Sequence, residues 1–153
     1  MPPARSSLLR RAVECCPAAL RGLSDDDLLL VLGESGDPVV RAAGQDAGRR
    51  VLAAFPDEPG TLFNLGLSYG RVRPGLRIGG PEGAQAVALF EQVLALREPI
   101  PEWMEGWSAY LAAEWLAASD PARARTLARR AAASGADTDG LQGRIAALLL
   151  RIP

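Results

Sequence analysis

The sequence contains no histidine and no lysine. Histidine is the commonest general base and the commonest metal ligand in proteins. Lysine forms Schiff bases with substrates and contacts phosphate in Walker-type nucleotide sites. Only carboxylates, hydroxyls, arginines and two cysteine thiols remain as reactive groups. We therefore expect a protein that is not an enzyme and that uses neither a cofactor nor a metal.

Residues that favour β-strands are also scarce. Aromatic side chains make up 5% of the chain, and valine, isoleucine and threonine are few beside alanine, leucine and arginine. Alanine, leucine and arginine are strong helix formers. The 153 residues, 48% of them hydrophobic, are enough for one compact domain with a core. The composition predicts a single all-α domain.

The charge is nearly balanced. The 17 basic residues are all arginine, which is typical of a GC-rich bacterial genome, and the 18 acidic residues leave a formal net charge of −1. A nucleic-acid-binding protein or a polybasic membrane surface needs an excess of basic residues. Arg10, Arg11 and Glu14 interrupt any apolar core of a signal peptide, and no apolar run could span a bilayer. We expect a cytoplasmic protein that binds neither nucleic acid nor membrane.

Start and stop signals for helices recur along the chain. Ser24, Asp37-Pro38 and Asp120-Pro121 are typical first-turn sequences, and glycines follow several of the apolar runs. These signals predict about eight helices: 5–21, Ser24 to Gly33, Asp37 to Phe55, Leu62 to Val72 with Thr61 as its cap, Pro81 to Arg97, Glu102 to Ala118, Asp120 to Ser134, and a last helix that Asp137 or Thr138 caps and that includes Ile145 to Ile152.

The centre of the chain contains a pattern that matches a known repeat. A large residue, a Leu-Gly pair and an aromatic residue follow one another at helical spacing, and the next predicted helix carries alanine, an aromatic residue and a small residue. The residues are Leu62, Leu65, Gly66 and Tyr69, then Ala86, Phe90 and Val93. This stretch resembles the tetratricopeptide-repeat family, in which helix pairs stack into a solenoid.

Two weaker copies flank the first. The second copy consists of Leu111, Ala112 and Trp115, followed by Ala124, Ala128 and Ala131; a half copy before both consists of Ala47, Val51, Ala54 and Pro59. The resemblance implies antiparallel helix pairs stacked as a short right-handed α-solenoid. Its parts would be N-terminal helices (1–36), a half repeat (37–59), a first repeat with a loop insertion (60–99), a second repeat (102–135) and a capping helix (137–152).

The resemblance also implies a function. In this family the first helices of the repeats line a concave groove that binds another protein. By register, Phe63, Leu67 and Arg71 of the first copy would face the groove, together with Ala109, Ala113 and Leu116 of the second. Phe63 and Leu67 would anchor a helix or extended peptide of the partner, Arg71 would pair with an acidic group, and Trp103 is the tryptophan expected to be exposed. The lysine and asparagine clamp of some family members has no match here.

The first repeat carries an insertion. From Trp115 to Ala124 is nine positions, whereas from Tyr69 to Ala86 is seventeen, so eight residues are added. The added loop 71–80 contains Arg71, Arg73 and Arg77 beside the pair Gly79-Gly80 and precedes a helix start. Free amides and arginines can hold a small anion. The alternative is that the loop only turns the chain and the arginines stay solvated.

Several other features have a structural explanation. Cys15 and Cys16 are adjacent and point apart on a helix, so we expect two ordinary thiols. The acidic run 25–27 suits a helix start better than a metal site, and the tryptophans suit core packing. The apolar C-terminal helix and the tryptophans leave one further alternative open, a structural homodimer.

Overall fold

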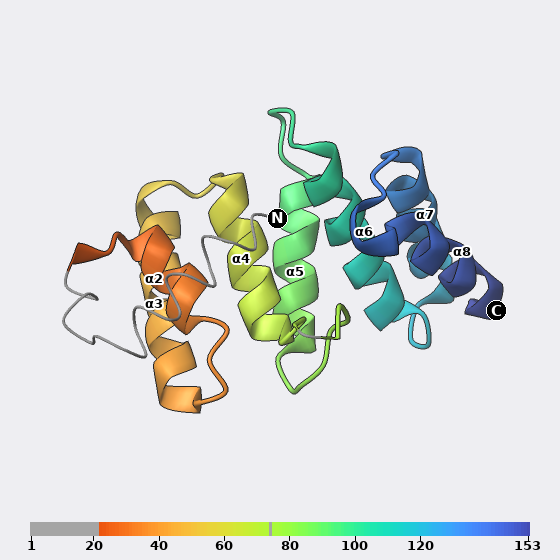
Figure 1. Ribbon diagram of the computed structural model, residues 1–153. Coiled ribbons are helices and arrows are strands. Elements are labelled where there is room, and N and C mark those ends of the chain that lie inside the picture. The colour runs from red at the N-terminus through yellow and green to blue at the C-terminus, as the bar shows by residue number, and fades with distance from the viewer. Residues whose placement is uncertain (1–21, 74) are drawn as a thin grey trace.

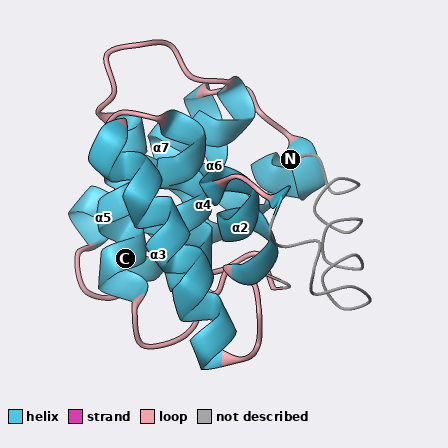
Figure 2. Cartoon of the chain, turned by 90° about the vertical axis from the view of Figure 1, so that its left-hand side faces the viewer, coloured by secondary structure: helices cyan, strands magenta, loops and turns pink. Residues whose placement is uncertain are grey.

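The computed structural model describes residues 22–73 and 75–153, and in these ranges the chain consists of helices and connections without a strand (Figure 2). The predicted all-α class is confirmed. The predicted helix 5–21 and both cysteines lie outside the described residues. Seven α-helices fall within them: α2 (Asp25–Leu32), α3 (Pro38–Ala54), α4 (Pro59–Gly70), α5 (Gly83–Leu94), α6 (Glu102–Leu116), α7 (Pro121–Ala133) and α8 (Leu141–Arg151), with a short 3-10 helix η2 (Thr138–Gly140) before α8.

The predicted helix starts with local caps are confirmed. The Ser24 hydroxyl accepts a hydrogen bond from the Asp27 amide at 3.3 Å. The Asp37 carboxylate accepts from the amides of the second and third residues of α3, and Pro38 is its first residue. Asp120 caps α7 in the same way, again just before a proline. Each cap satisfies amides that have no partner within the helix.

The start of α4 differs from the prediction. The helix begins at Pro59, and the side chain of Glu58 accepts from the amides of Gly60 and Thr61. Thr61 is therefore not a cap. It lies inside the first turn and is buried. Its hydroxyl is within hydrogen-bonding distance of two carboxylates, Asp26 at the start of α2 at 2.8 Å and Glu58, which share its single proton.

Three helices are shorter at their ends than the sequence predicts. The α4 helix stops at Gly70 because Arg71 adopts the left-handed conformation with φ 48°. The α5 helix begins two residues after Pro81 and ends at Leu94, and α8 begins only after η2, although the Asp137 carboxylate still accepts from the Gln142 amide at 2.9 Å. These differences follow from irregular turns at the connections.

The helices follow one another in a row from α2 and α3 to α8 (Figure 1). The most extensive contacts join α2 to α3, α4 to α5 and α6 to α7, and further contacts join α3 to α4, α5 to α6 and α7 to α8. The α3–α4 and α5–α6 connections lie at the upper end of the helices in Figure 1, and the longer 71–82 connection lies at the lower end. Packing between sequence neighbours thus accounts for the arrangement.

Small residues allow close approach between paired helices. A Cβ atom on Gly66 would lie 2.8 Å from Cε1 of Phe90, so the absence of a side chain at this position lets α4 and α5 approach closely. Phe90 belongs to an aromatic cluster. Its ring centroid lies 5.7 Å from that of Phe63, and the Phe63 centroid lies 5.4 Å from that of Trp103. This cluster joins α4, α5 and α6 in the core.

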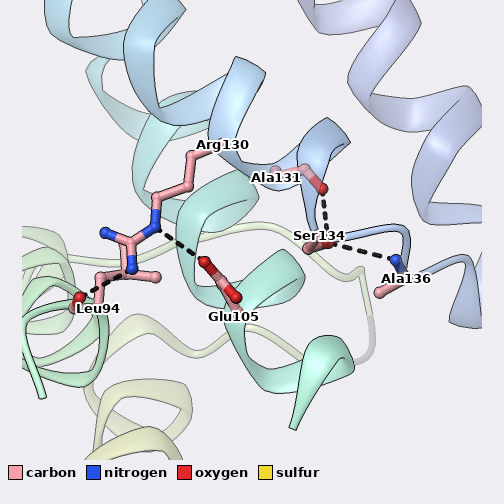
Figure 3. A network of polar contacts seen from close by, with 6 residues as sticks. All are labelled: Leu94, Glu105, Arg130, Ala131, Ser134 and Ala136. Carbon is pink, nitrogen blue, oxygen red and sulfur yellow. Dashed lines mark hydrogen bonds and ion pairs between the residues drawn. The ribbon is translucent and has the colours of Figure 1, made fainter. Parts of the chain in front are cut away.

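Arg130 of α7 connects this helix to α5 and α6. Its Nη2 donates to the Leu94 carbonyl at the end of α5 at 2.8 Å, and its Nε donates to Glu105 of α6 at 3.1 Å (Figure 3). Nearby, the Ser134 hydroxyl donates to the Ala131 carbonyl at 2.6 Å. A cation at a helix C-terminus satisfies orphan carbonyls and suits the helix dipole.

Candidate functional site

The predicted groove residues belong largely to the core. Phe63 is 1% exposed, Leu67 6% and Leu116 8%. Trp103 is half-buried against Phe63, whereas Trp115 is the exposed tryptophan. The structure therefore does not present Phe63 and Leu67 as open anchors, because the protein itself covers both side chains.

The burial of these residues follows from the composition of α4. Eight of its twelve residues are buried, and they lie on every side of the helix. A helix that is apolar all round is a central helix rather than a groove wall. Two polar side chains are drawn into the same interior. Ser68 of α4 donates to the Gly33 carbonyl at 2.6 Å and accepts from Gln45 of α3 at 3.1 Å.

The loop insertion is anchored to the core. Val72 and Ile78 are buried, and the Gly79 amide donates to the Gly70 carbonyl at 2.8 Å. The Leu76 amide donates to the Val72 carbonyl at 2.7 Å, which closes a turn within the loop. The loop is thus a built part of the fold at the lower end of α4 and α5.

Two of the three loop arginines pair with carboxylates of other elements. Arg73 lies 3.0 Å from Glu34, in the α2–α3 connection, and Arg77 lies 4.0 Å from Glu114 of α6. A hollow beside Arg71 and Arg73 measures only about 50 Å³ and includes Glu34. Arg41 lines the same hollow, so three arginines and one carboxylate surround this small space. Of the loop arginines, Arg73 and Arg77 are already used in ion pairs within the protein.

A larger cleft lies at the other end of the helices. It measures about 490 Å³ and is formed by the start of α2, the end of α3 and the turn that follows. Phe55 borders it and is 66% exposed. We call the lining residues the Phe55 surface: Asp25, Asp26, Arg50, Val51, Phe55 and Glu58, with Asp57 on the adjoining turn.

The Phe55 surface is rich in carboxylates. Asp25 accepts from Arg50 at 2.9 and 3.3 Å, and this hydrogen bond holds the pKa of Asp25 below its usual value of 3.8. Asp26 accepts from Thr61, and Glu58 caps α4. Asp57 is exposed and makes no hydrogen bond or ion pair with the residues that the structure describes.

A second cleft lies across the same turn. It measures about 450 Å³, and its lining includes Asp57, Pro59, Leu96 and Ile100. Leu96 and Ile100 come from the α5–α6 connection, which lies beside the α3–α4 turn at the upper end of the helices (Figure 1). The α3–α4 turn therefore separates two hollows that both contain apolar side chains.

Sequence reasoning missed Phe55 as a surface residue. It treated Phe55 only as the end of a helix, and the structure agrees that Phe55 follows the last residue of α3. A usable signal was present, because an aromatic side chain directly before a proline in a short acidic turn, FPDEP, has no helix face to join.

Other kinds of site are not found in the described ranges. No group of three histidine, cysteine or acidic side chains there could hold a metal ion. Among the helices of residues 22–73 and 75–153, none is both long enough and apolar enough to cross a bilayer. Comparison with protein-family models, with curated proteins and with solved structures finds no match, so this site is interpreted from its own geometry.

Proposed function

We propose that this protein is a protein-binding module and that its partner docks on the Phe55 surface. The observation that carries the proposal is Phe55, exposed beside a cleft of about 490 Å³. Full burial of a phenylalanine contributes roughly 1.5–3 kcal/mol. Because Phe55 is still 66% exposed, a partner that covers it would gain about two-thirds of that amount. Aromatic anchors of this kind dominate many interfaces.

The helix packing supports a finer proposal for the fold. Contacts between neighbours in sequence, with α2–α3, α4–α5 and α6–α7 as the closest pairs, are those of a stacked helical repeat. We propose a short right-handed α-solenoid similar to tetratricopeptide repeats, with α8 as its cap. Gly66 against Phe90 supports the first repeat. In such an array the helix connections form accessible edges, and the Phe55 surface is one of them.

A second candidate is self-assembly through α8. Leu150, on the outer side of this helix, is 89% exposed. A homodimer that buried Leu150 would give the protein a structural role. The third alternative, an anion sensor at loop 71–80, has less support, because Arg73 and Arg77 already pair with carboxylates.

The test compares three single variants in affinity capture from a native extract. Phe55→Asp changes the proposed site, and Leu150→Asp changes α8. Val39→Asp is the matched control, since Val39 is 79% exposed near the start of α3, away from the cleft. We expect a protein retained by the wild type and by Val39→Asp to be lost with Phe55→Asp. If Phe55→Asp retains the same proteins, the Phe55 surface is not the docking site.

The same samples distinguish self-assembly. Sedimentation of the purified wild type in dilute solution gives its molar mass, to compare with the 16.1 kDa of one chain. A mass of twice that value that Leu150→Asp halves would favour the homodimer. A monomer in both samples leaves α8 without an assembly role.

A further inference from the structure

We infer that the segment docking on the Phe55 surface is a basic peptide segment of a partner protein, with an apolar side chain next to an arginine or lysine. This inference rests on the proposed function, since it names the chemistry of the partner at the same site. It follows from three features of the surface: its net charge, the one carboxylate that no contact uses, and the apolar hollows on both sides of that carboxylate.

The net charge of the surface is negative. Asp25, Asp26, Asp57 and Glu58 outnumber Arg50, the one cation that lines the same hollows. The cleft on the other side of Asp57 adds Arg97 and Glu98, whose charges cancel. The first turns of α2 and α4 lie in the same place, and each helix start contributes roughly half a positive charge. The sum is still about two negative charges. A nucleic acid or an acidic peptide would be repelled here, whereas a basic segment would be attracted.

The carboxylates differ in how far the fold already uses them. Asp25 is held by Arg50, Asp26 by Thr61, and Glu58 by the amides at the start of α4. Their charges are explained by folding alone. Asp57 is exposed, caps no helix and has no partner among the described residues. It is the position at which an incoming cation gains an ion pair without breaking one.

The hollows on both sides of Asp57 determine what accompanies the cation. Phe55, Pro56 and Asp57 line one shared hollow, and Asp57 also borders the cleft of Leu96 and Ile100. A segment that crosses the turn meets the exposed Phe55, then a free carboxylate, then a cleft in which Leu96 and Ile100 lie beside Arg97 and Glu98. The complementary segment carries an apolar side chain for Phe55 and a basic side chain for Asp57.

A selection experiment identifies the preferred chemistry without a known partner. A phage library of random twelve-residue peptides is selected on the immobilised wild-type protein and depleted on Phe55→Asp. We expect the enriched peptides to have a positive net charge and arginine or lysine beside an apolar residue. Enriched peptides that are neutral or acidic would overturn the basic-partner inference and leave the docking site standing. No enrichment over the depleted pool would overturn the docking site as well.

One enriched peptide, labelled with fluorescein, then tests the role of Asp57. We expect Asp57→Asn to raise the Kd about fivefold, the effect of one exposed ion pair. Asp139→Asn is the matched control, because it makes the same change of charge on the exposed turn before α8. We also expect binding to weaken as salt rises from about 0.05 M to about 0.5 M, which shortens the screening length. Equal Kd values for the two variants would refute the pairing with Asp57.

Discussion

Replacing Gly44 by alanine should destabilise the protein, although alanine is the better helix former. Gly44 lies in the middle of α3, where alanine would contribute about 1 kcal/mol relative to glycine. A Cβ atom there would lie 2.8 Å from the Leu32 carbonyl carbon and 2.9 Å from the Gly33 Cα, and closer still to the Gly33 amide nitrogen. All three are backbone atoms, so no side chain can move aside.

The size of the effect follows from what must move. The end of α2 would have to retreat from α3 by several tenths of an ångström or more, and overpacking of this kind costs about 1–3 kcal/mol. The retreat also pulls the Gly33 carbonyl from Ser68, a bond of 2.6 Å whose net contribution is about 1 kcal/mol. After the gain in helix propensity, we expect a net loss of about 2 kcal/mol.

Urea unfolding followed by circular dichroism measures this loss, and Gly143→Ala is the matched control. Gly143 lies within α8 and has nothing within 4 Å of the position of its Cβ. Its replacement should raise the unfolding free energy by about 0.5–1 kcal/mol. In thermal unfolding the Gly44 variant should melt about 4–8 °C lower than the wild type. If both variants gained stability, the close approach of α2 and α3 would be refuted.

Three further predictions use the same unfolding assay. Ser108→Ala should stabilise the protein by about 1 kcal/mol, because this buried hydroxyl has no partner within the described residues; a loss would show that it does. Arg130→Ala should cost about 1–2 kcal/mol by leaving the Leu94 carbonyl without its donor, and an unchanged value would refute that bond. Asp25 has a pKa below 3.8 when folded, because Arg50 donates to it, so it contributes stability above that pH and loses it as the pH falls through the folded pKa. Asp25→Asn should therefore flatten the acid side of the pH–stability profile, and a profile as steep as the wild type's would count against the ion pair.

The sequence predicted those helix starts that depend on neighbouring residues. Ser24, Asp37 and Asp120 cap their own helices through hydrogen bonds to amides two or three residues further along the chain. Such short-range patterns can be recognised in the sequence. The prediction that Thr61 caps a helix was wrong because its contact is distant in sequence. Its hydroxyl reaches Asp26, 35 positions away, and Glu58 serves the helix start in its place. Nothing local distinguishes a threonine that caps from one that packs.

The position of the proposed binding surface could not be obtained from the register of a repeat. Register gives the direction in which Phe63 points along α4, but exposure depends on what other segments lie over it. Phe63 meets Phe90 and Trp103, which come from two later helices. Phe55 differs from Phe63 in burial, because it follows the end of a helix and no later segment among the described residues covers it. Both outcomes are set by tertiary contacts that helix periodicity does not encode.

The anchored loop gives a physical reason for the proposed binding surface to lie at the opposite end of the helices. Val72 and Ile78 hold the loop in the core, whereas Arg77 between them is exposed and Arg73 is half-buried. Arg73 then reaches Glu34 on one side, and Arg77 approaches Glu114 on the other. The insertion thus connects three helix pairs at the lower end in Figure 1. The upper end has no such cross-connection at Phe55 and Asp57 among the described residues, so both side chains stay exposed, as the proposed docking requires.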